Sequence, residues 1–348
     1  MTKQIVKTLL KEKGTFIIAE LSANHNQNLD VALKTVRAAA DAGADAIKLQ
    51  TYTADTITIN CNNKYFKIHH GTLWDGRTLY DLYKEAYMPW EWHEALFAEA
   101  KKCGLVCFST PFDYSAVDFL EKLKVPAYKV ASFEIFDTPL IEYIAKKKKP
   151  VIMSTGLATL PDIQDAVGAC HKAGNKKIAL LKCTSAYPAP VEEANLLTLP
   201  DMKKRFKCTV GLSDHTLGTT VALTSVALGA KIIEKHFILD KKLGGPDAAF
   251  SLSPGEFGLM VRQIREAEKA MGKVTYEVSE KARPSLQLAR SLFVVKDIKK
   301  GEVLTSENIR SIRPGYGISP KHYNDVLGKK AKAELKRGSP LAWNDIIM

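Results

Sequence analysis

Short apolar runs recur along the first two thirds of the chain, and each is followed by a more polar stretch. Eight such runs are TFIIAEL (15–21), AIKLQT (46–51), VCFST (106–110), AYKVAS (127–132), PVIMSTG (150–156), IALLKCT (178–184), TVGLSDH (209–215) and KIIEKHF (231–237). They are nearly continuous in apolar residues instead of alternating, which is typical of parallel strands covered on both faces. The pattern therefore predicts a parallel β-sheet.

The stretches between these runs have the spacing of amphipathic helices. After the first run, for example, Val31, Leu33 and Val36 form an apolar stripe, and Gly43 supplies a stop signal. Strand–helix units that repeat eight times predict an α/β protein with a (β/α)8 TIM barrel. A doubly wound sheet is the alternative, but no glycine-rich phosphate-binding motif follows the first run.

The pattern changes after a last amphipathic segment at 256–272. Residues 273–284 are polar and predict a linker between a barrel domain at 1–272 and a second domain at 285–348. The second domain contains strand-like runs at 290–298 and 333–341, with turns at Gly301 and Gly338. Because this segment is too short for a large core, it predicts a small β-rich domain.

Charge and composition narrow the class of protein. The 348 residues carry a formal net charge of +12, but no basic stretch is interleaved with aromatic residues, so we expect no nucleic-acid partner. The positive charge is better explained by a small anionic substrate that the protein binds. The chain shows no membrane-spanning apolar run, no signal-peptide core at its start and no zinc-type cysteine spacing. We therefore expect a cytoplasmic protein with no membrane partner.

Polar side chains gather where the predicted strands end, which is where the chemistry of such barrels lies. In chain order they are Glu20, Lys48, Gln50, Thr110, Lys129, Ser132, Glu134, Ser154, Lys182, Ser185, Tyr187, Ser213, His215, Glu234 and His236. Each one alone is compatible with an ordinary loop residue or a satisfied core polar group. Their recurrence at nearly every strand end predicts an active site at this mouth of the barrel.

His215 and His236 fall at corresponding positions of neighbouring predicted strands, so their imidazoles can meet over the barrel mouth. Two imidazoles suit Mn²⁺, Co²⁺ or Zn²⁺ better than Mg²⁺, and they leave positions open for substrate oxygens. The alternative is one histidine hydrogen-bonded in the rim and one general acid. We predict a divalent metal site, with Mn²⁺ first and Co²⁺ or Mg²⁺ as alternatives.

Two lysines and several hydroxyls at the strand ends can hold a compact trianion. They are Lys48 and Lys129 with Thr110, Ser132, Ser154, Ser185 and Ser213, although helix capping accounts for some of these hydroxyls. Glu20 and Glu134 are candidates for proton transfer, for holding substrate hydroxyls, or for ion pairs with barrel lysines. A Schiff base on Lys129 or Lys182 is the competing chemistry.

Several motifs in one order resemble those of the sialic acid synthase family. They are IAELSANHNQ, ADAIKLQTY, FSTPFD, AYKVASFE, STGLAT, KCTSAYP, VGLSDHT and EKHF. RSLFVVKDIKKGEVLTSENIRSIRPGYG resembles the family's C-terminal SAF, or antifreeze-like, domain, so the likeness spans residues 15–345. It implies a transferase that condenses phosphoenolpyruvate with an amino-sugar aldehyde and releases phosphate, making a nine-carbon sugar acid for flagellin or another surface glycan.

The resemblance also implies a role for each matching residue. His215 and His236 would bind the metal, and Glu20 would act in catalysis with them. The residues that would bind phosphoenolpyruvate are Lys48, Thr110, Lys129, Ser132, Ser154, Ser185 and Ser213. Those that would bind the sugar are Gln50, Thr72, Glu134, Tyr187, Asp247 and Arg313. The resemblance further implies a domain-swapped homodimer, in which each SAF domain covers the partner's barrel mouth and contributes Arg313.

The expected acceptor depends on finer features of the sequence. GTLWDGRTLYDLYKEAYMPWEWH and GGPDAAFSL look most like the members that act on 2,4-diacetamido-2,4,6-trideoxy-L-altrose. Ser185 stands where the N-acetylneuraminate synthases have Asn, and Thr72 lies near the position of their sugar-binding Asn. We therefore do not expect N-acetylmannosamine as acceptor, and a legionaminic-type precursor is the closest alternative.

Two further classes of protein stay as alternatives. A 3-deoxy-heptulosonate phosphate synthase shares the barrel and phosphoenolpyruvate, but its phosphorylated acceptor would demand extra arginines at the strand ends, where few occur. An SAF-like segment acting alone is a carbohydrate- or ice-binding module, which does not explain the polar ring on the barrel.

Overall fold

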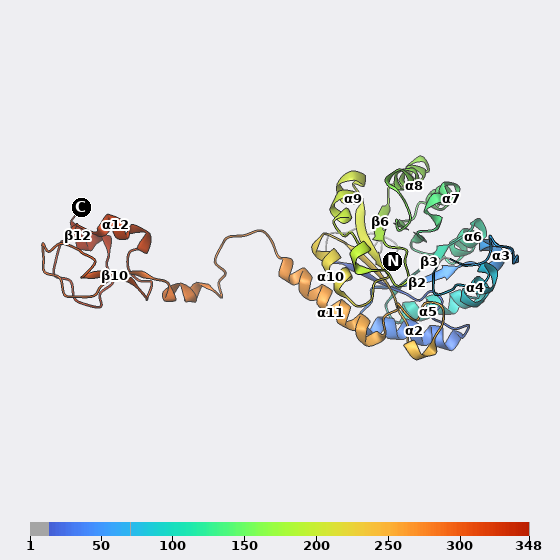
Figure 1. The fold of residues 1–348 in the computed structure, drawn as a ribbon, viewed down its shortest axis with the longest axis horizontal. Helices are drawn as coiled ribbons and strands as arrows, with labels where there is room; N and C mark the ends of the chain where they lie inside the picture. Colours follow the sequence, from blue (N-terminus) through green and yellow to red (C-terminus); the bar gives the residue numbers. More distant parts are fainter. Residues whose placement is uncertain (1–13, 70, 348) are drawn as a thin grey trace. The chain divides into compact units, whose positions relative to one another are not determined.

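The computed structural model describes residues 14–69 and 71–347, so the N-terminal segment in which no signal-peptide core is expected lies outside the described residues. The chain divides into two compact units, Met1–Gly272 and Lys273–Met348. The first holds a closed barrel and its helices, and the second holds two small sheets (Figure 1). Within the described residues, no helix has the length and apolar character needed to cross a membrane.

Parallel strands close the barrel in chain order, and the last pairs with the first. They are β1 (Phe16–Glu20), β2 (Ala46–Thr51), β3 (Val106–Pro111), β4 (Tyr128–Val130), β5 (Val151–Ser154), β6 (Ile178–Cys183), β7 (Thr209–Asp214) and β8 (Ile232–His236). Each predicted apolar run coincides with one of these strands, although β3 extends one residue beyond its run, to Pro111, so the prediction of a (β/α)8 barrel is confirmed.

Alternate residues of each strand face opposite sides, and both sides are apolar over most of the strand. Ile18, Ala46 and Ile152 belong to the cluster inside the barrel, whereas Ile17 and Ile47 pack outward against the helices. Toward the carboxyl ends the inward row becomes polar. Glu20 follows Ile18, Lys48 follows Ala46 and Ser154 follows Ile152, each two positions later along its strand.

One glycine permits the close approach of β7 and β8 below this polar layer. A Cβ at Gly211 would lie 2.3 Å from the Ile232 carbonyl oxygen and 2.7 Å from Leu181 Cδ2, so no larger residue fits. Ser213 and Glu234 follow directly above on the inward rows of the two strands and are paired in register. The glycine thus allows the strand spacing that brings these two polar residues together.

Helices cover the outside of the barrel (Figure 1). They are α2 (Leu29–Asp41), α5 (His93–Lys102), α6 (Tyr114–Lys122), α7 (Thr138–Lys146), α8 (Leu160–Lys172), α9 (Thr198–Phe206), α10 (Thr220–Ala227) and α11 (Pro254–Met271). Side-chain caps fix several starts: Asn28 accepts from backbone amides of α2, and Asp113 from those of α6.

A long insertion separates β2 from α5 and adds material at the barrel mouth. It contains α3 (Ala54–Ile57), α4 (Leu79–Ala86) and a short 3-10 helix, η1 (Trp90–Trp92). The indole of Trp90 donates to the Tyr52 carbonyl at 3.1 Å, and the Gln27 side chain donates to the Glu85 carbonyl at 3.0 Å. Because the insertion follows the carboxyl end of β2, these bonds hold it on the side where the polar layer lies.

The second unit has its own small apolar core, which includes Leu292, Ile309 and Leu341. Strand β9 (Ser291–Val294) pairs with β10 (Ile309–Ile312), and β11 (Lys330–Ala331) pairs with β12 (Ile346–Ile347). The strand expected at 333–341 is wrong, since this segment makes only isolated bridges through Leu335 and Pro340. The turns at Gly301 and Gly338 are present, and both glycines have positive φ.

Candidate active site

A cavity of about 480 Å³ opens at the carboxyl ends of the strands. Most of the predicted site residues line it: Glu20, Lys48, Gln50, Thr72, Lys129, Ser132, Glu134, Ser154, Tyr187, Ser213, His215, His236 and Asp247. Two other predicted residues do not line the cavity but are hydrogen-bonded to residues that do. Thr110 accepts from Lys48 Nζ at 3.2 Å, and Ser185 is hydrogen-bonded to Ser132. Arg313 is an exposed residue of the second unit.

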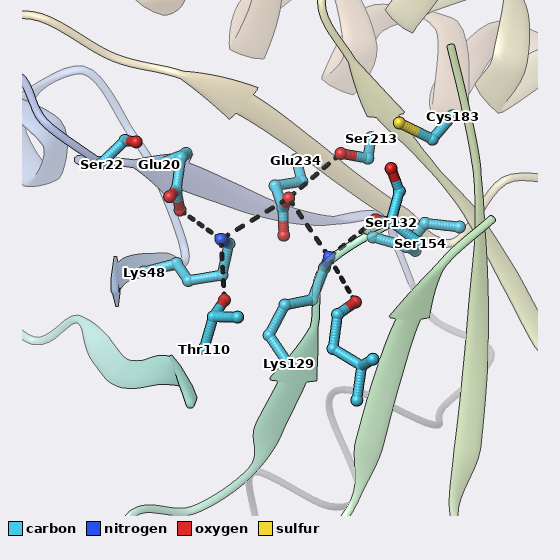
Figure 2. Close-up of polar contacts among 12 residues, drawn as sticks. Glu20, Ser22, Lys48, Thr110, Lys129, Ser132, Ser154, Cys183, Ser213 and Glu234 are labelled. Carbon is cyan, nitrogen blue, oxygen red and sulfur yellow. Dashed lines mark hydrogen bonds and ion pairs between the residues drawn. The ribbon is translucent and has the colours of Figure 1, made fainter. Parts of the chain in front are cut away.

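Four buried charges form the floor of the cavity (Figure 2). Lys48 Nζ lies 2.7 Å from Glu20 Oε2. Glu234 lies between the two lysines, with its Oε1 at 3.8 Å from both Lys48 Nζ and Lys129 Nζ. All four side chains are at most 6% exposed, so each carboxylate replaces hydration that a lysine has lost.

Hydroxyls complete the coordination of this network. Lys129 Nζ donates to Ser154 Oγ at 2.7 Å and to the Val130 carbonyl at 3.0 Å. Ser213 Oγ donates to Glu234 Oε1 at 3.1 Å. The predicted lysine–hydroxyl cluster is therefore assembled around Glu234, a residue noted in the sequence but given no role there.

The pKa values of the two carboxyl groups on the floor are shifted in opposite directions. Burial raises the pKa of Glu20 to about 7, against the opposing effect of Lys48. Burial also acts to raise the pKa of Glu234, but Lys129 and Lys48 outweigh it and hold this pKa below its ordinary value. Glu20 is thus able to hold or release a proton near neutral pH, whereas Glu234 stays ionised.

The two predicted metal ligands lie together above this floor. Their ring centroids are 5.3 Å apart. His215 Nδ1 lies 2.9 Å from the Thr184 carbonyl oxygen, which leaves Nε2 available as a ligand. His236 Nδ1 is buried without a hydrogen-bond partner and lies 3.6 Å from Asp247 Oδ2. Burial, followed by the nearby charge of His215, keeps the pKa of His236 well below its ordinary value, so the imidazole is neutral.

These features fit a divalent metal that also takes ligands from substrate and water. A neutral, unpartnered imidazole nitrogen and a second imidazole oriented by a carbonyl are suitable donors. In the described part of the chain, no group of three or more His, Cys, Asp or Glu side chains is placed to hold a metal ion. The pair would therefore leave several coordination positions open.

A second buried ion pair fixes the strands that carry the histidines. Lys235 Nζ lies 2.6 Å from Asp214 Oδ2 and also donates to the Thr216 carbonyl. Asp214 Oδ1 accepts from the backbone amide and hydroxyl of Thr216 at 2.9 and 2.8 Å. Both charged residues face outward from the barrel, between the inward-facing positions. They position the backbone on either side of His215 and next to His236.

The rest of the cavity wall comes from residues that the sequence analysis did not assign. The insertion supplies Ile68, Trp74 and Leu82, and Tyr52 follows β2. No strand-end signal points to these residues, because they lie in irregular segments or on a short helix. Trp74 and Leu82 belong to GTLWDGRTLYDLY, a motif that supports only the resemblance.

The side chains of Thr72 and Lys182 each donate a hydrogen bond within their own segment. Thr72 lines the cavity, but its hydroxyl donates to Asp75 Oδ1 at 3.0 Å within its own turn. Lys182 lies on the outward row of β6 and donates to the Cys183 carbonyl at 2.8 Å, so the register of β6 keeps it off the cavity floor. Of the two Schiff-base candidates, only Lys129 lines the cavity.

Comparisons with known proteins show which proteins this chain resembles. A family model described as the NeuB family matches residues 35–276, and one described as the SAF domain matches residues 289–347. A pseudaminic acid synthase of Campylobacter jejuni (strain 81-176) is 46% identical over 334 residues, which cover 96% of this chain and 97% of the relative. An N,N'-diacetyllegionaminic acid synthase of Campylobacter jejuni (strain NCTC 11168) is 40% identical, covering 93% of this chain and 98% of that protein.

A solved structure gives the same result at the level of the fold. The crystal structure of an N-acetylneuraminic acid synthetase from Leptospira borgpetersenii has a TM-score of 0.70 and 31% identity. The match covers 79% of this chain and 90% of that chain.

The buried carboxyl of Glu134 predicts a measurable pH dependence of stability. Burial raises its pKa from 4.5 to about 7. The unfolded chain releases this proton near pH 4.5 and the folded chain holds it to about pH 7, so the carboxyl costs up to about 3 kcal/mol of stability above pH 7. Glu134→Gln should leave the free energy of unfolding unchanged near pH 4.5 and raise it by up to that amount near pH 8, as measured by urea denaturation.

Asp162 provides a control with the opposite electrostatics. Its side chain accepts from the Thr159 hydroxyl and amide, and these hydrogen bonds lower its pKa below 3.8. Asp162→Asn should therefore reduce stability equally at about pH 5 and pH 8, because this carboxyl is ionised at both. A stability difference for Glu134→Gln that did not grow between these pH values would contradict the assignment of a protonated buried carboxyl.

Proposed function

The chain belongs to the NeuB family, and we propose that it is a pseudaminic acid synthase, which condenses phosphoenolpyruvate with 2,4-diacetamido-2,4,6-trideoxy-L-altrose and releases phosphate. The family resemblance drawn from the motifs is thereby confirmed. The observation that carries the chemistry is the pair of buried lysines, Lys48 and Lys129, with their hydroxyl partners on the floor of the cavity. The acceptor is supported by the higher identity to the pseudaminic acid synthase than to the legionaminic acid synthase.

The floor of the cavity suits a phosphate and a carboxylate. Lysine ammonium groups interact with phosphate oxygens as point charges, and hydroxyls add directed hydrogen bonds. In the free protein, Glu20 and Glu234 neutralise the lysines. With its pKa raised to about 7, Glu20 can accept a proton when an anion arrives, which leaves the floor with net positive charge.

The metal is part of the proposal. His215 and His236 would hold a divalent ion, Mn²⁺ first, since one imidazole is neutral and the other is oriented through its Nδ1. When bound, such an ion acts as a Lewis acid toward the aldehyde of the open-chain sugar. Beside these histidines, the aldehyde would lie above the lysines that would hold phosphoenolpyruvate.

The reaction needs one new C–C bond, one added water and loss of phosphate. Carbon 3 of phosphoenolpyruvate attacks the aldehyde carbon, water adds at carbon 2, and the C–O bond to phosphate breaks. Lys48 and Lys129 stabilise the negative charge of the departing phosphate. Glu20 is placed to move a proton, because its pKa lies near 7 and Gln50 Nε2 donates to its Oε1 at 3.1 Å. Gln50, Tyr187 and Asp247 lie along the cavity wall, where they can contact the sugar.

A panel of acceptors tests the proposed function. With phosphoenolpyruvate and Mn²⁺, we expect phosphate release with the diacetamido-trideoxy sugar and a kcat/KM for N-acetylmannosamine at least about 100-fold lower. The legionaminic-type precursor, which differs in stereochemistry, is the closest competitor in the panel. Comparable kcat/KM for N-acetylmannosamine, or covalent trapping of Lys129 by borohydride in the presence of substrate, would show that the function is wrong.

Loss of either histidine should weaken metal binding. We expect His215→Ala and His236→Ala each to raise the dissociation constant for Mn²⁺ by more than the roughly 10- to 100-fold typical of second-shell changes, and to abolish most turnover. Titration calorimetry measures the affinity, and circular dichroism checks that the fold is intact. His171→Ala, on the exposed surface of α8, is the matched control and should bind Mn²⁺ as the wild type does. Unchanged Mn²⁺ affinity in either site variant would remove the metal assignment.

We also propose that the second unit acts on a partner's barrel in a homodimer. Exposed apolar side chains follow four successive strands on the rim of the mouth: Phe133 (57% exposed), Leu157 (46%), Val191 (53%) and Leu217 (59%). An apolar rim of this kind is typical of a surface that a partner covers. Arg313 presents an exposed guanidinium on the second unit, and its planar set of donors suits amide and hydroxyl oxygens of a sugar.

Subunit mixing tests this action in trans. Arg313→Ala and His236→Ala should each be nearly inactive alone. Their mixture should recover up to about a quarter of wild-type activity, because half of the dimers are then mixed and each has one intact mouth. Absence of recovery despite demonstrated subunit exchange would contradict action in trans, and so would a monomer in sedimentation.

A further inference from the structure

One side of the cavity carries apolar side chains, in contrast to its charged floor. The insertion between β2 and α5 contributes Ile68, Trp74 and Leu82 to the lining. Ile68 and Leu82 are each only 7% exposed. Since the floor contains two lysines and two carboxylates, the cavity is polar at the strand ends. Beneath the insertion, Ile68, Trp74 and Leu82 form an apolar patch beside the more polar Tyr65, Lys67 and Tyr83.

Trp74 connects this apolar side to the opposite side of the mouth. Its indole N–H donates to the Pro246 carbonyl at 3.2 Å, in the loop after β8. Its ring lies 5.5 Å from the ring of Tyr187, in the loop after β6, and Tyr187 lies 4.4 Å from the ring of His215. A single aromatic side chain therefore separates Trp74 from a candidate metal ligand.

The Thr72 side chain in the turn around Trp74 already has hydrogen-bond partners, so it does little to replace the water around a substrate hydroxyl. The Thr72 hydroxyl donates to Asp75 and also accepts from the Trp74 backbone amide at 3.3 Å, so it serves its own turn. A sugar hydroxyl placed against Trp74, Ile68 and Leu82 would lose hydration without a compensating hydrogen bond from these side chains. A methyl group in the same place would gain from burial.

We propose that Trp74, together with Ile68 and Leu82, holds the C6 methyl group of the acceptor and selects a 6-deoxy sugar over its 6-hydroxy counterpart. This inference rests on the proposed function. In that acceptor the aldehyde at C1 reacts above the lysines, beside the histidines, and C6 is the opposite end of the carbon chain. The apolar side of the cavity is the part of the lining that matches a deoxygenated terminus.

The test uses two acceptors that differ only at C6: the diacetamido-trideoxy sugar and its counterpart with a 6-hydroxyl. Phosphate release gives kcat/KM for each, and the wild type should prefer the 6-deoxy sugar by about 10- to 100-fold. Trp74→Ala should reduce this preference at least about tenfold, mainly by lowering kcat/KM for the 6-deoxy sugar. The KM for phosphoenolpyruvate should stay at the wild-type value, because the floor is unchanged.

Two further variants separate the apolar contact from other effects. Leu73→Ala truncates the neighbouring side chain of the same turn, which is 54% exposed and does not line the cavity, so the preference should stay as in the wild type. Trp74→Phe keeps an aromatic ring but removes the bond to Pro246, and it should keep most of the preference.

Each contrary result overturns the inference in a recognisable way. A wild-type preference that survives in Trp74→Ala, or is lost equally in Leu73→Ala or in Trp74→Phe, contradicts an apolar contact at Trp74. Turnover of the 6-deoxy sugar without any preference in the wild type overturns this inference but leaves the proposed function standing. No turnover of either sugar by the wild type overturns both.

Discussion

The buried contact of Glu234 with Lys48 and Lys129 is the constraint on which the rest of the site depends. Two ammonium groups in a protein interior repel each other and lose hydration, and both effects favour the neutral amine. Glu234 Oε1, at 3.8 Å from each Nζ, offsets part of this cost and favours the charged form of both lysines, while burial holds the pKa of Lys129 below its ordinary value. Removing one partner from such a buried network typically costs 3–5 kcal/mol, because it leaves an uncompensated charge. The proposed anion site therefore includes a carboxylate as a structural requirement.

A barrel supplies this network in a way that isolated loops do not. Each strand contributes inward-facing residues at alternate positions, so an apolar layer lies directly below the polar one. Phe108, Ile152 and Ile232 fill the interior beneath, and all three are at most 1% exposed. Because backbone hydrogen bonds fix the strand register, they also fix the Cα positions of Glu20, Lys48 and Glu234, so the three side chains are already close together in the folded barrel.

The sequence predicts this arrangement as far as it depends on strand periodicity. Eight apolar runs place the strands, and their ends place the lysines, hydroxyls and histidines. Periodicity does not show which carboxylate compensates which lysine. The sequence alone therefore gives Glu234 no role, although it lies two residues before His236. Periodicity also does not describe the insertion: Trp74 lies in a turn whose position depends on a distant carbonyl, that of Pro246. Thr72, whose hydroxyl donates to Asp75 within its own turn, lies in the same irregular segment.

Strand β8 carries candidate site residues on one face and a structural ion pair on the other. Glu234 and His236 face the cavity, whereas Lys235 between them faces outward and pairs with Asp214 at 2.6 Å. The inward contacts involve the proposed anion site and a candidate metal ligand, and the outward pair connects β8 to β7, which leads into His215. Alternation along the strand keeps the two charge networks on opposite faces, so the inward residues can respond to substrate while the outward pair maintains the spacing of the histidines. Together with the backbone pairing of β7 and β8, a pair of residues that does not line the cavity therefore supports the spacing of the two imidazoles.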